Sequence, residues 1–284
     1  MLKFKDFMLI YDAYRRLELP DPLDETLRLF NILSDGKLQD VLSARKLEAA
    51  DVETIAARRR EGEPPEYILG RALFMGNTFY CTKDTLIPRP ETSLLVKAAE
   101  DFIVRNSTRD SDTRTVIEIG TGCGNIAVSV ALACEEGVKI LASDISPAAV
   151  EVARKNVQKF NLEEKVALYC GDLYEPFNEY RGKTDIVICN PPYIPTTSLK
   201  KLARQIIDHE PVVALDGGPY GLSIFRRLIH EAPTFLKEDG VLMFEIGEGQ
   251  EKLVERLLIK HDAYKDIEFF KYEGKVRAVS AIKK

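Results

Sequence analysis

The hydrophobic pattern divides the chain into a short part with helical spacing and a longer part in which apolar runs alternate with amphipathic stretches. In residues 1–70, apolar side chains recur every three or four positions, as in DPLDETLRLFNILSDG and ADVETIAARRREGEPPEYILG. This spacing is typical of helices that bury one face. We therefore expect a small helical domain at residues 1–72.

Residues 73–92 have a different character, because aromatic and strand-favouring residues replace the helical spacing. The stretch FMGNTFYCTKDTLIP contains two turn candidates, Gly76-Asn77 and Lys83-Asp84, and predicts a hairpin or an extended connector. The sequence PRPET then interrupts the pattern, and a helical run follows from Glu91 to about Arg105. We expect residues 73–92 to connect the helical domain to a larger domain at residues 93–284.

From residue 115 onward, short apolar runs alternate with helical patterns. The runs expected to form strands are TVIEIG, KILASD, VALYCGD, DIVICN, VLMFEIG, IEFFK and VRAVSAI. Alternation of strands and helices is typical of a doubly wound, largely parallel sheet. Only YEGK separates the last two runs, which is too short for a parallel crossover, so these two strands should pair antiparallel. The predicted fold class is α/β, with a Rossmann-like sheet of seven mostly parallel strands.

Composition narrows the class of protein. The 284 residues, 45% hydrophobic and 30% charged, are ordinary for a globular protein that buries a sizeable core. A net charge of −5, from 40 basic and 45 acidic side chains, speaks against binding nucleic acid by bulk charge. No apolar run is long enough to cross a bilayer, and the amino terminus lacks the apolar stretch of a signal peptide. We expect a cytoplasmic protein, a monomer, that binds neither membrane nor nucleic acid.

The cysteines and histidines do not have the spacing of metal ligands. The five cysteines lie at positions 81, 123, 134, 170 and 189, with no CxxC pair, which indicates reduced thiols. His209 precedes Glu210-Pro211 and is expected near the substrate cleft, whereas His230 and His261 lie in helical patterns. We therefore predict no metal site.

A glycine-rich turn follows the first strand of the large domain. In TVIEIGTGCGNIAVSV, Gly120, Gly122 and Gly124 leave space for a ligand to approach the backbone. The dinucleotide fingerprint requires a glycine at the next position, where the chain has Asn125. The turn alone is a weak indication of binding, because glycines also serve close packing of a helix against a strand.

The next two strands each end in an aspartate. Asp144 ends the second strand, at the position from which a carboxylate accepts hydrogen bonds from both hydroxyls of a ribose. Asp172 follows the third strand, where a carboxylate can accept from an adenine amino group. Each can instead cap a helix, as Ser146-Pro147 after Asp144 indicates. Because parallel strands end at one edge of a sheet, the glycine turn and the two aspartates together indicate a nucleoside crevice.

With these residues the sequence resembles the S-adenosylmethionine-dependent methyltransferases of the Rossmann-like class, whose first motif matches Glu118–Gly124. The resemblance implies that the turn wraps the methionine part of S-adenosylmethionine and that Glu118 lies near its ammonium group. The cofactor-binding residues that it implies are Gly120, Thr121, Gly122, Cys123, Gly124, Asp144, Asp172, Leu173 and Asn190.

The fourth strand ends in Asn190-Pro191-Pro192-Tyr193. Methyl transfer to a planar nitrogen needs that nitrogen held in line with the methyl group, with acceptors for its protons. Asn190 offers its side-chain oxygen, and Pro191 offers a carbonyl that the prolines hold in place. Tyr193 can lie flat against the planar group. These four residues are the predicted catalytic and substrate-binding residues, and a simple turn is the alternative.

The tetrapeptide is shared by methyltransferases of glutamine amides and of adenine N6, so it does not separate the two substrates. The stretches EGEPPEYILGRALFMGNTFYCTKDTLIPRPETSLLV, HEPVVALDGGPYGLSIFRRLI and MFEIGEGQ are similar to the peptide chain release factor N5-glutamine methyltransferases, the HemK or PrmC family. The resemblance implies methylation of the glutamine in the Gly-Gly-Gln loop of class 1 release factors, which the helical domain would help to grip. Methylation of a ribosomal-protein glutamine, adenine-N6 methylation, and a non-catalytic cofactor-binding protein are the alternatives.

The same resemblance implies secondary roles for residues near the connector. Arg89 and Glu91 are expected to build the wall between the connector and the catalytic domain. Phe79 either covers the cofactor or belongs to the core of the hairpin. The chain departs from the family pattern at Ser93 and at Pro219-Tyr220.

Overall fold

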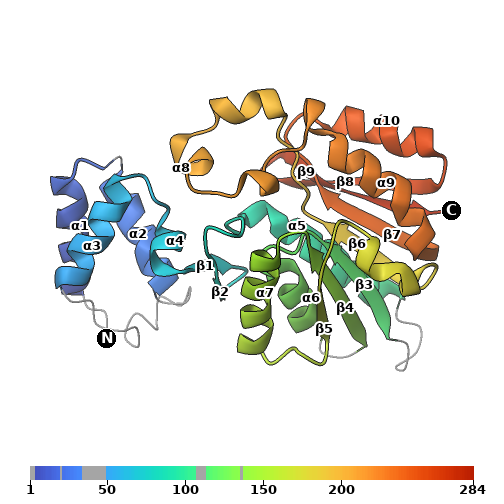
Figure 1. Ribbon diagram of the computed structural model, residues 1–284, viewed down its shortest axis with the longest axis horizontal. Coiled ribbons are helices and arrows are strands. Elements are labelled where there is room, and N and C mark those ends of the chain that lie inside the picture. Colours follow the sequence, from blue (N-terminus) through green and yellow to red (C-terminus); the bar gives the residue numbers. More distant parts are fainter. Residues whose placement is uncertain (1–3, 20, 34–48, 107–112, 135–136) are drawn as a thin grey trace.

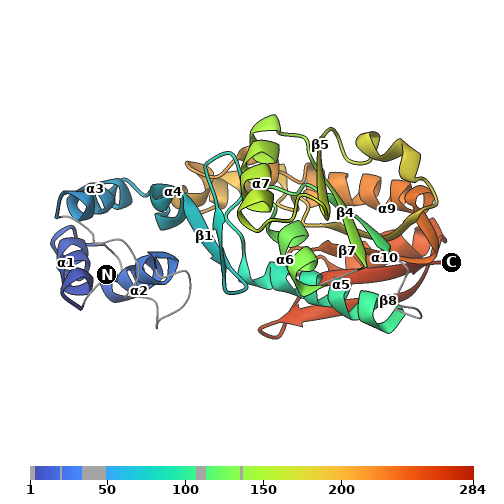
Figure 2. The same cartoon turned by 90° about the horizontal axis from the view of Figure 1, so that it is seen from below.

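The computed structural model describes residues 4–19, 21–33, 49–106, 113–134 and 137–284. A helical part comes first, a β-hairpin follows, and an α/β domain forms the rest (Figure 1). Both Figure 1 and Figure 2 place the helical part at one end of the molecule, with the hairpin between it and the large domain. Among the described residues, no helix has the length and apolarity that crossing a membrane requires.

The helical part has a core of its own. Its helices are α1 (Phe4–Arg16), α2 (Pro22–Leu33), α3 (Ala49–Arg60) and the short α4 (Pro65–Leu69). The helix α2 begins at Pro22, because a proline in the first turn lacks only an N–H that has no helical partner there. The core consists of apolar residues at helical spacing, namely Ile10, Ala13, Tyr14, Leu29, Phe30, Val52, Ile55 and Ala56. These helices confirm the helical pattern of the described residues.

The hairpin consists of β1 (Arg71–Phe74) and β2 (Asn77–Tyr80), which pair antiparallel. Its turn is Met75-Gly76, one residue before the predicted Gly76-Asn77, and both turn residues have positive φ, as tight hairpins require. The predicted turn at Lys83-Asp84 is confirmed. Because the hairpin begins at Arg71, two residues before the expected connector, the predicted boundary cuts through β1.

Phe79 belongs to the core of the hairpin. Its ring is fully buried and packs against Phe74 and Phe160, with ring centroids 6.3 and 5.3 Å away. This contact joins the hairpin to the large domain, because Phe160 directly follows α7 (Pro147–Lys159). Of the two interpretations of Phe79, the structure supports the core aromatic.

The large domain contains one seven-stranded sheet in the order β5-β4-β3-β6-β7-β9-β8. The strands are β3 (Arg114–Ile119), β4 (Val138–Asp144), β5 (Val166–Cys170), β6 (Thr184–Cys189), β7 (Leu236–Glu245), β8 (Tyr264–Tyr272) and β9 (Lys275–Lys283). Strands β3 to β7 pair parallel, and β9 pairs antiparallel with both β7 and β8. The predicted seven-stranded, mostly parallel sheet is confirmed.

The two faces of the sheet pack against different helices. The helices are α5 (Ser93–Asn106), α6 (Asn125–Ala133) and α7 on one face, and α9 (Ser223–Phe235) and α10 (Glu251–His261) on the other. Val116 of β3 belongs to the first core and Ile117 to the second, because successive side chains of a strand point to opposite faces. Burial of both faces explains why the central strands are apolar throughout.

Chain reversal at β3 creates the crevice. The chain runs from β3 through β4 to β5 on one side and then continues with β6 on the other side of β3. Ligands of open α/β sheets bind outside the carboxyl ends of the strands at such a switch point. The remaining short elements are η2 (Pro90–Thr92), η3 (Glu175–Tyr180), η4 (Thr196–Lys201), α8 (Arg204–Ile207), η5 (Val212–Ala214) and η6 (Pro219–Gly221).

Candidate functional site

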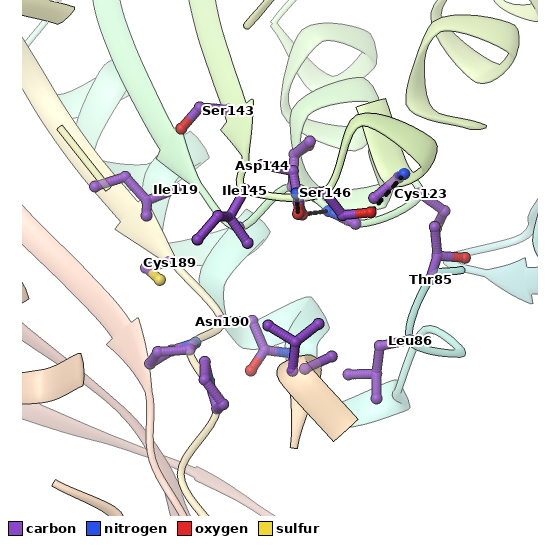
Figure 3. Close-up of a pocket in the computed structure, with 18 of the residues that line it drawn as sticks. Thr85, Leu86, Ile119, Cys123, Ser143, Asp144, Ile145, Ser146, Cys189 and Asn190 are labelled. Atoms are coloured by element: carbon purple, nitrogen blue, oxygen red, sulfur yellow. Dashed lines mark hydrogen bonds between the residues drawn. The ribbon is translucent and has the colours of Figure 1, made fainter. Parts of the chain in front are cut away.

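A pocket lies at the carboxyl ends of β3, β4, β5 and β6, and Figure 3 shows the residues around it. Most of the predicted site residues line it, namely Gly120, Thr121, Gly122, Cys123, Asp144, Asp172, Leu173, Asn190, Pro191 and Pro192. Gly124 and Tyr193 do not belong to this lining. The structure therefore brings most of these residues together at one pocket, and the two exceptions have other surroundings.

The three glycines of the turn serve two different purposes. Gly120 and Gly122 have φ of +69° and +55°, and a Cβ built on either would meet nothing within 4 Å. This open space allows a ligand to approach the backbone. A Cβ on Gly124, in contrast, would lie 3.3 Å from the Cβ of Ala153 in α7. Close helix packing is therefore the role of Gly124 alone.

Asp144 shapes the turn from the end of β4. Its Oδ2 accepts from the N–H of Gly122 and its Oδ1 from the N–H of Ser146, both at 2.9 Å (Figure 3). Ser146 in turn caps α7 by accepting from Ala149. Burial raises the pKa of Asp144 above its ordinary value. Each carboxylate oxygen keeps lone pairs for a further donor, so capping and ligand binding are compatible at this residue.

Asp172 is engaged by a cation that the sequence did not indicate. Both of its oxygens accept from the guanidinium of Arg227 in α9, at 3.2 and 2.8 Å. The ion pair is partly exposed, with 39% of the Asp172 side chain accessible to solvent. An adenine amino group would therefore approach a carboxylate that is already paired, and this contact stays a prediction.

Glu118 carries an unpartnered acceptor beneath the glycine turn. Its Oε2 accepts from Thr121 Oγ1 at 2.8 Å and from the N–H of Ala127 at 3.0 Å. Its Oε1 is buried and has no hydrogen-bond partner among the residues that the structure describes. Burial raises the pKa of Glu118 to about 8. A buried acid without a partner suits a neighbouring cation, but Glu118 itself is not part of the pocket lining. The contact with the ammonium group of the cofactor stays a prediction.

The raised pKa of Glu118 has a consequence for stability. Between pH 4.5 and about 8, the folded protein keeps this carboxyl protonated while the unfolded chain ionises it. Unfolding then releases a proton, so the free energy of unfolding falls as the pH rises through this window. Glu118→Gln keeps an acceptor for Thr121 and Ala127 but does not titrate. The free energy of unfolding of the cofactor-free variant, relative to that of wild type, should therefore be higher at pH 8 than at pH 5.

The measurement is chemical denaturation of wild type and variant at both pH values. Glu179→Gln, which changes an exposed carboxylate, is the matched control. Parallel pH dependence of wild type and Glu118→Gln would mean that Glu118 is ionised in the folded protein.

Asn190 is oriented by Thr92, the last residue of η2, which directly precedes α5. Its Nδ2 donates to Thr92 Oγ1 at 3.2 Å. Within the described residues, no hydrogen bond to its Oδ1 is formed, and Asn190 lines the pocket. The side-chain oxygen is therefore the part of Asn190 that can accept from a ligand.

Tyr193 does not line that pocket, and its hydroxyl belongs to a network of charged groups. Its hydroxyl donates to Glu245 Oε1 at 3.3 Å and accepts from Arg277 at 2.9 Å. Glu245 also accepts from Thr92 Oγ1 at 2.7 Å, and burial raises its pKa to about 7. Arg277 forms an ion pair with Glu91 at 2.8 Å. The prediction that Tyr193 lies flat against the substrate group stays a prediction.

A loop that contains Gly221 packs against the backbone at the end of the tetrapeptide. A Cβ on Gly221, at φ of +68°, would lie 2.0 Å from the carbonyl oxygen of Tyr193. Gln250 Nε2 donates to the same oxygen at 3.0 Å, and Ile194 forms a β-bridge with Asp216. Only glycine allows so close an approach, which fixes the backbone after β6.

The expected wall at the connector is built from ion pairs with distant residues. Arg89 pairs with the buried Glu210 at 2.5 Å, whereas Glu91 pairs with Arg277. Near this wall, the Nε2 atom of His209 lies 3.7 Å from the position of a Cβ on Gly62 in the helical part. His209 therefore lies at the contact between the two parts.

Sequence reasoning missed Thr92, Glu245 and Arg277 as residues of the site. Thr92 and Glu245 lie in PRPET and MFEIG, two stretches that carry the family resemblance, so a signal was present. Nothing in the local pattern indicated that they meet.

The cysteines include a buried set and one exposed residue, Cys170. No group of three or more metal-ligating side chains occurs in the described part of the chain.

Comparisons with known proteins give consistent relatives. The family model of the Methyltransferase small domain matches residues 96–219. The chain is 37% identical over 222 residues to the Release factor glutamine methyltransferase of Bacillus cereus, covering 78% of this chain and 77% of that protein. It is 34% identical over 258 residues to the protein of that name from Bacillus anthracis, covering 89% of each. 

Solved structures share the fold. The crystal structure of the hMettl16 catalytic domain in complex with MAT2A 3'UTR hairpin 6 matches with a TM-score of 0.57 and 17% identity. The match covers 84% of this chain and 85% of that chain. The Human methyltransferase 10 domain containing protein matches with a TM-score of 0.50 and 22% identity over 70% of this chain and 85% of its own. At these identities the likeness shows a methyltransferase fold.

Proposed function

The chain belongs to the family of release factor glutamine methyltransferases, and we propose that it methylates the side-chain amide nitrogen (N5) of a glutamine in class 1 peptide chain release factors. The methyl donor in this proposal is S-adenosylmethionine, and the target is the glutamine of the Gly-Gly-Gln loop. The observation that carries the proposal is Asn190 at the pocket, with its amide N–H bonded to Thr92 and its oxygen left to accept.

The glycine turn and the strand ends around it are the proposed cofactor site. Gly120 and Gly122 provide the open approach to the backbone, and Asp144 offers lone pairs to the ribose hydroxyls. The unpartnered Oε1 of Glu118 suits the ammonium group. When bound, S-adenosylmethionine supplies an electrophilic methyl group on a positively charged sulfur.

The tetrapeptide is the proposed substrate clamp. An amide nitrogen is a weak nucleophile because its lone pair is delocalised, so orientation has to contribute much of the rate. Asn190 Oδ1 and the Pro191 carbonyl accept the two amide protons and fix the nitrogen in the pocket. Both acceptors are in place before the substrate arrives, which avoids reorganisation during the reaction.

Proton loss completes the proposed chemistry. The nitrogen would become acidic as its bond to the methyl carbon forms and the bond between that carbon and the donor sulfur breaks, with the electron pair left on sulfur. One of the two amide protons then leaves, to an acceptor or to water. No strong general base is required for this step. Asn190 therefore acts by orientation and polarisation, since a neutral amide does not take up the proton.

The helical part is the proposed gripping domain for the release factor. Its position in the chain supports this proposal. Helix α4 leads directly into the hairpin, and the hairpin is followed by the segment from Arg89 to Thr92, whose last residue contacts Asn190. The location in the cytoplasm, the monomeric state and the absence of nucleic-acid binding stay predictions.

The deciding experiment uses methyl-labelled S-adenosylmethionine, the purified protein and a class 1 release factor. A parallel reaction contains the same factor with its loop glutamine changed to alanine. We expect label in the first reaction and none in the second, with mass spectrometry locating one methyl group on the glutamine side chain. Equal labelling of both factors would contradict the assignment of the loop.

The alternatives have their own outcomes in this assay. If the release factor takes no label although the cofactor binds, ribosomal proteins are tested next. Labelling of nucleic acid that nuclease treatment abolishes would favour adenine-N6 methylation. Cofactor binding without turnover on any of these substrates would favour a non-catalytic protein.

A further inference from the structure

Thr92 lies between the predicted catalytic amide and a buried acid. Its hydroxyl oxygen is 3.2 Å from Asn190 Nδ2 on one side and 2.7 Å from Glu245 Oε2 on the other. Thr92 and Glu245 are each only 1% exposed. Water therefore does not compete for the Thr92 hydroxyl, and these two partners determine where its proton points.

The direction of these hydrogen bonds follows from the number of protons. A threonine hydroxyl has one proton to donate, and an ionised carboxylate can only accept. The Thr92 proton therefore points to Glu245, and its oxygen can only accept from Asn190. An asparagine amide has one donating and one accepting end, so its Nδ2 must face Thr92. Its Oδ1 must then face the opposite way, toward the pocket.

We propose that Thr92 and Glu245 are positioning residues for the methyl transfer, because they determine which end of the Asn190 amide faces the substrate nitrogen. This inference rests on the proposed function for its reaction, but the orientation itself is a property of the chain. Without Thr92, the amide can turn and present Nδ2, a donor, to the substrate amide. Two donors face each other in that arrangement, and the nitrogen is no longer held.

The charged groups around Glu245 act in opposite directions. Arg277, at 3.6 Å, favours the ionised carboxylate, as does the hydroxyl of Tyr193 at 3.3 Å. Burial, the largest effect, and Glu91 oppose ionisation, whereas the hydrogen bond from Thr92 favours it. Together these effects raise the pKa of Glu245 to about 7. If Glu245 is protonated, it can donate to Thr92, and Thr92 can then donate to Asn190 Oδ1. The methylation rate should therefore rise with pH as Glu245 ionises around pH 7.

Two substitutions of Thr92 separate the hydroxyl from the shape of the side chain. Thr92→Val keeps the volume and removes the hydroxyl, whereas Thr92→Ser keeps the hydroxyl. Because Thr92→Val frees the Asn190 amide to turn, kcat should fall about 10- to 100-fold, less than the loss expected when the Asn190 acceptor itself is removed. The kcat of Thr92→Ser should stay within about threefold of wild type. The Kd for S-adenosylmethionine should also stay within about threefold of wild type in both variants. Thr184→Val, at a buried threonine in β6, is the matched control.

Coupling to Asn190 is the decisive measurement. If Thr92 acts only through Asn190, then Thr92→Val has no further effect on kcat when Asn190 is already alanine. Full additivity of the two losses would overturn the proposal, because neighbours that act through one another are non-additive. An unchanged kcat in Thr92→Val would overturn it as well. A pH profile for wild type that is flat between pH 6 and 8 would remove the role of Glu245.

A readout that needs no substrate separates this inference from the proposed function. In ¹⁵N-labelled full-length protein, the side-chain amide protons of Asn190 should show the shift and slow exchange of a hydrogen bond. Thr92→Val should abolish both features and Thr92→Ser should retain them. If wild type does not methylate release factors, the proposed function fails, and this spectrum decides the orientation of Asn190 by itself. Spectra that are identical in wild type and Thr92→Val would overturn the inference.

Discussion

Replacing Asn190 with alanine is expected to lower the rate of methyl transfer about 10²- to 10³-fold, the range found when one preorganised hydrogen-bonding group of an active site is removed. The physical reason is that Asn190 Oδ1 accepts a proton of the reacting amide, while its Nδ2 is already bonded to Thr92. This contact matters most as the nitrogen becomes positively polarised. The Kd for S-adenosylmethionine should change less than about threefold, because only interactions specific to the transition state are lost.

Single-turnover rates at saturating cofactor, together with calorimetric titration of the cofactor, separate the two effects. Asn178→Ala, at an exposed position on η3, is the matched control for an asparagine-to-alanine change. Equal losses in rate and in cofactor affinity would mean that Asn190 is mainly a cofactor ligand. The mechanism of orientation would then have to rest on the Pro191 carbonyl alone.

Replacing Asp144 with alanine is expected to weaken cofactor binding about 10- to 100-fold, since a hydrogen bond to a charged group typically contributes about 1.5–3 kcal/mol. The rate at saturating cofactor should remain within about threefold of wild type, because Asp144 does not contact the reacting nitrogen in the proposed site. Calorimetric titration with S-adenosylmethionine gives the Kd. Asp239→Ala, at an exposed aspartate, is the matched control.

A second comparison distinguishes a lost ribose contact from a disordered turn. Asp144 also accepts from the N–H groups of Gly122 and Ser146, so its removal can disturb the glycine turn. The 2′-deoxy analogue of S-adenosylhomocysteine lacks one of the proposed donors. For wild type, the Kd of this analogue should be higher than the Kd of the parent compound. For Asp144→Ala, the two compounds should have the same Kd. Equal discrimination by both proteins would remove the ribose assignment.

The positions of the pocket residues followed from local patterns because the sheet is parallel. The residues after β3, β4, β5 and β6 were each recognised from a short stretch, and their convergence needed only the rule that parallel strands end at one edge. The lining of the pocket confirms that convergence for Gly120, Asp144, Asp172 and Asn190. The partners of these residues were not predictable in the same way. Arg227 faces Asp172 across 55 positions of the chain, and no periodicity encodes that separation.

The amino-acid sequence by itself determined the α/β class, the seven strands, the glycine turn and the tetrapeptide at the end of β6. Each of these depends on neighbouring residues, through side-chain periodicity, backbone restriction by proline and glycine, and the chemistry of a few consecutive groups. Only the tertiary structure decided that β9 lies between β7 and β8 in the sheet, and how Asn190 is oriented. Thr92 and Glu245 are 153 positions apart, and they meet because helix α5 and strand β7 pack together in the folded chain. Contacts of that range arise from packing, which a local pattern does not contain.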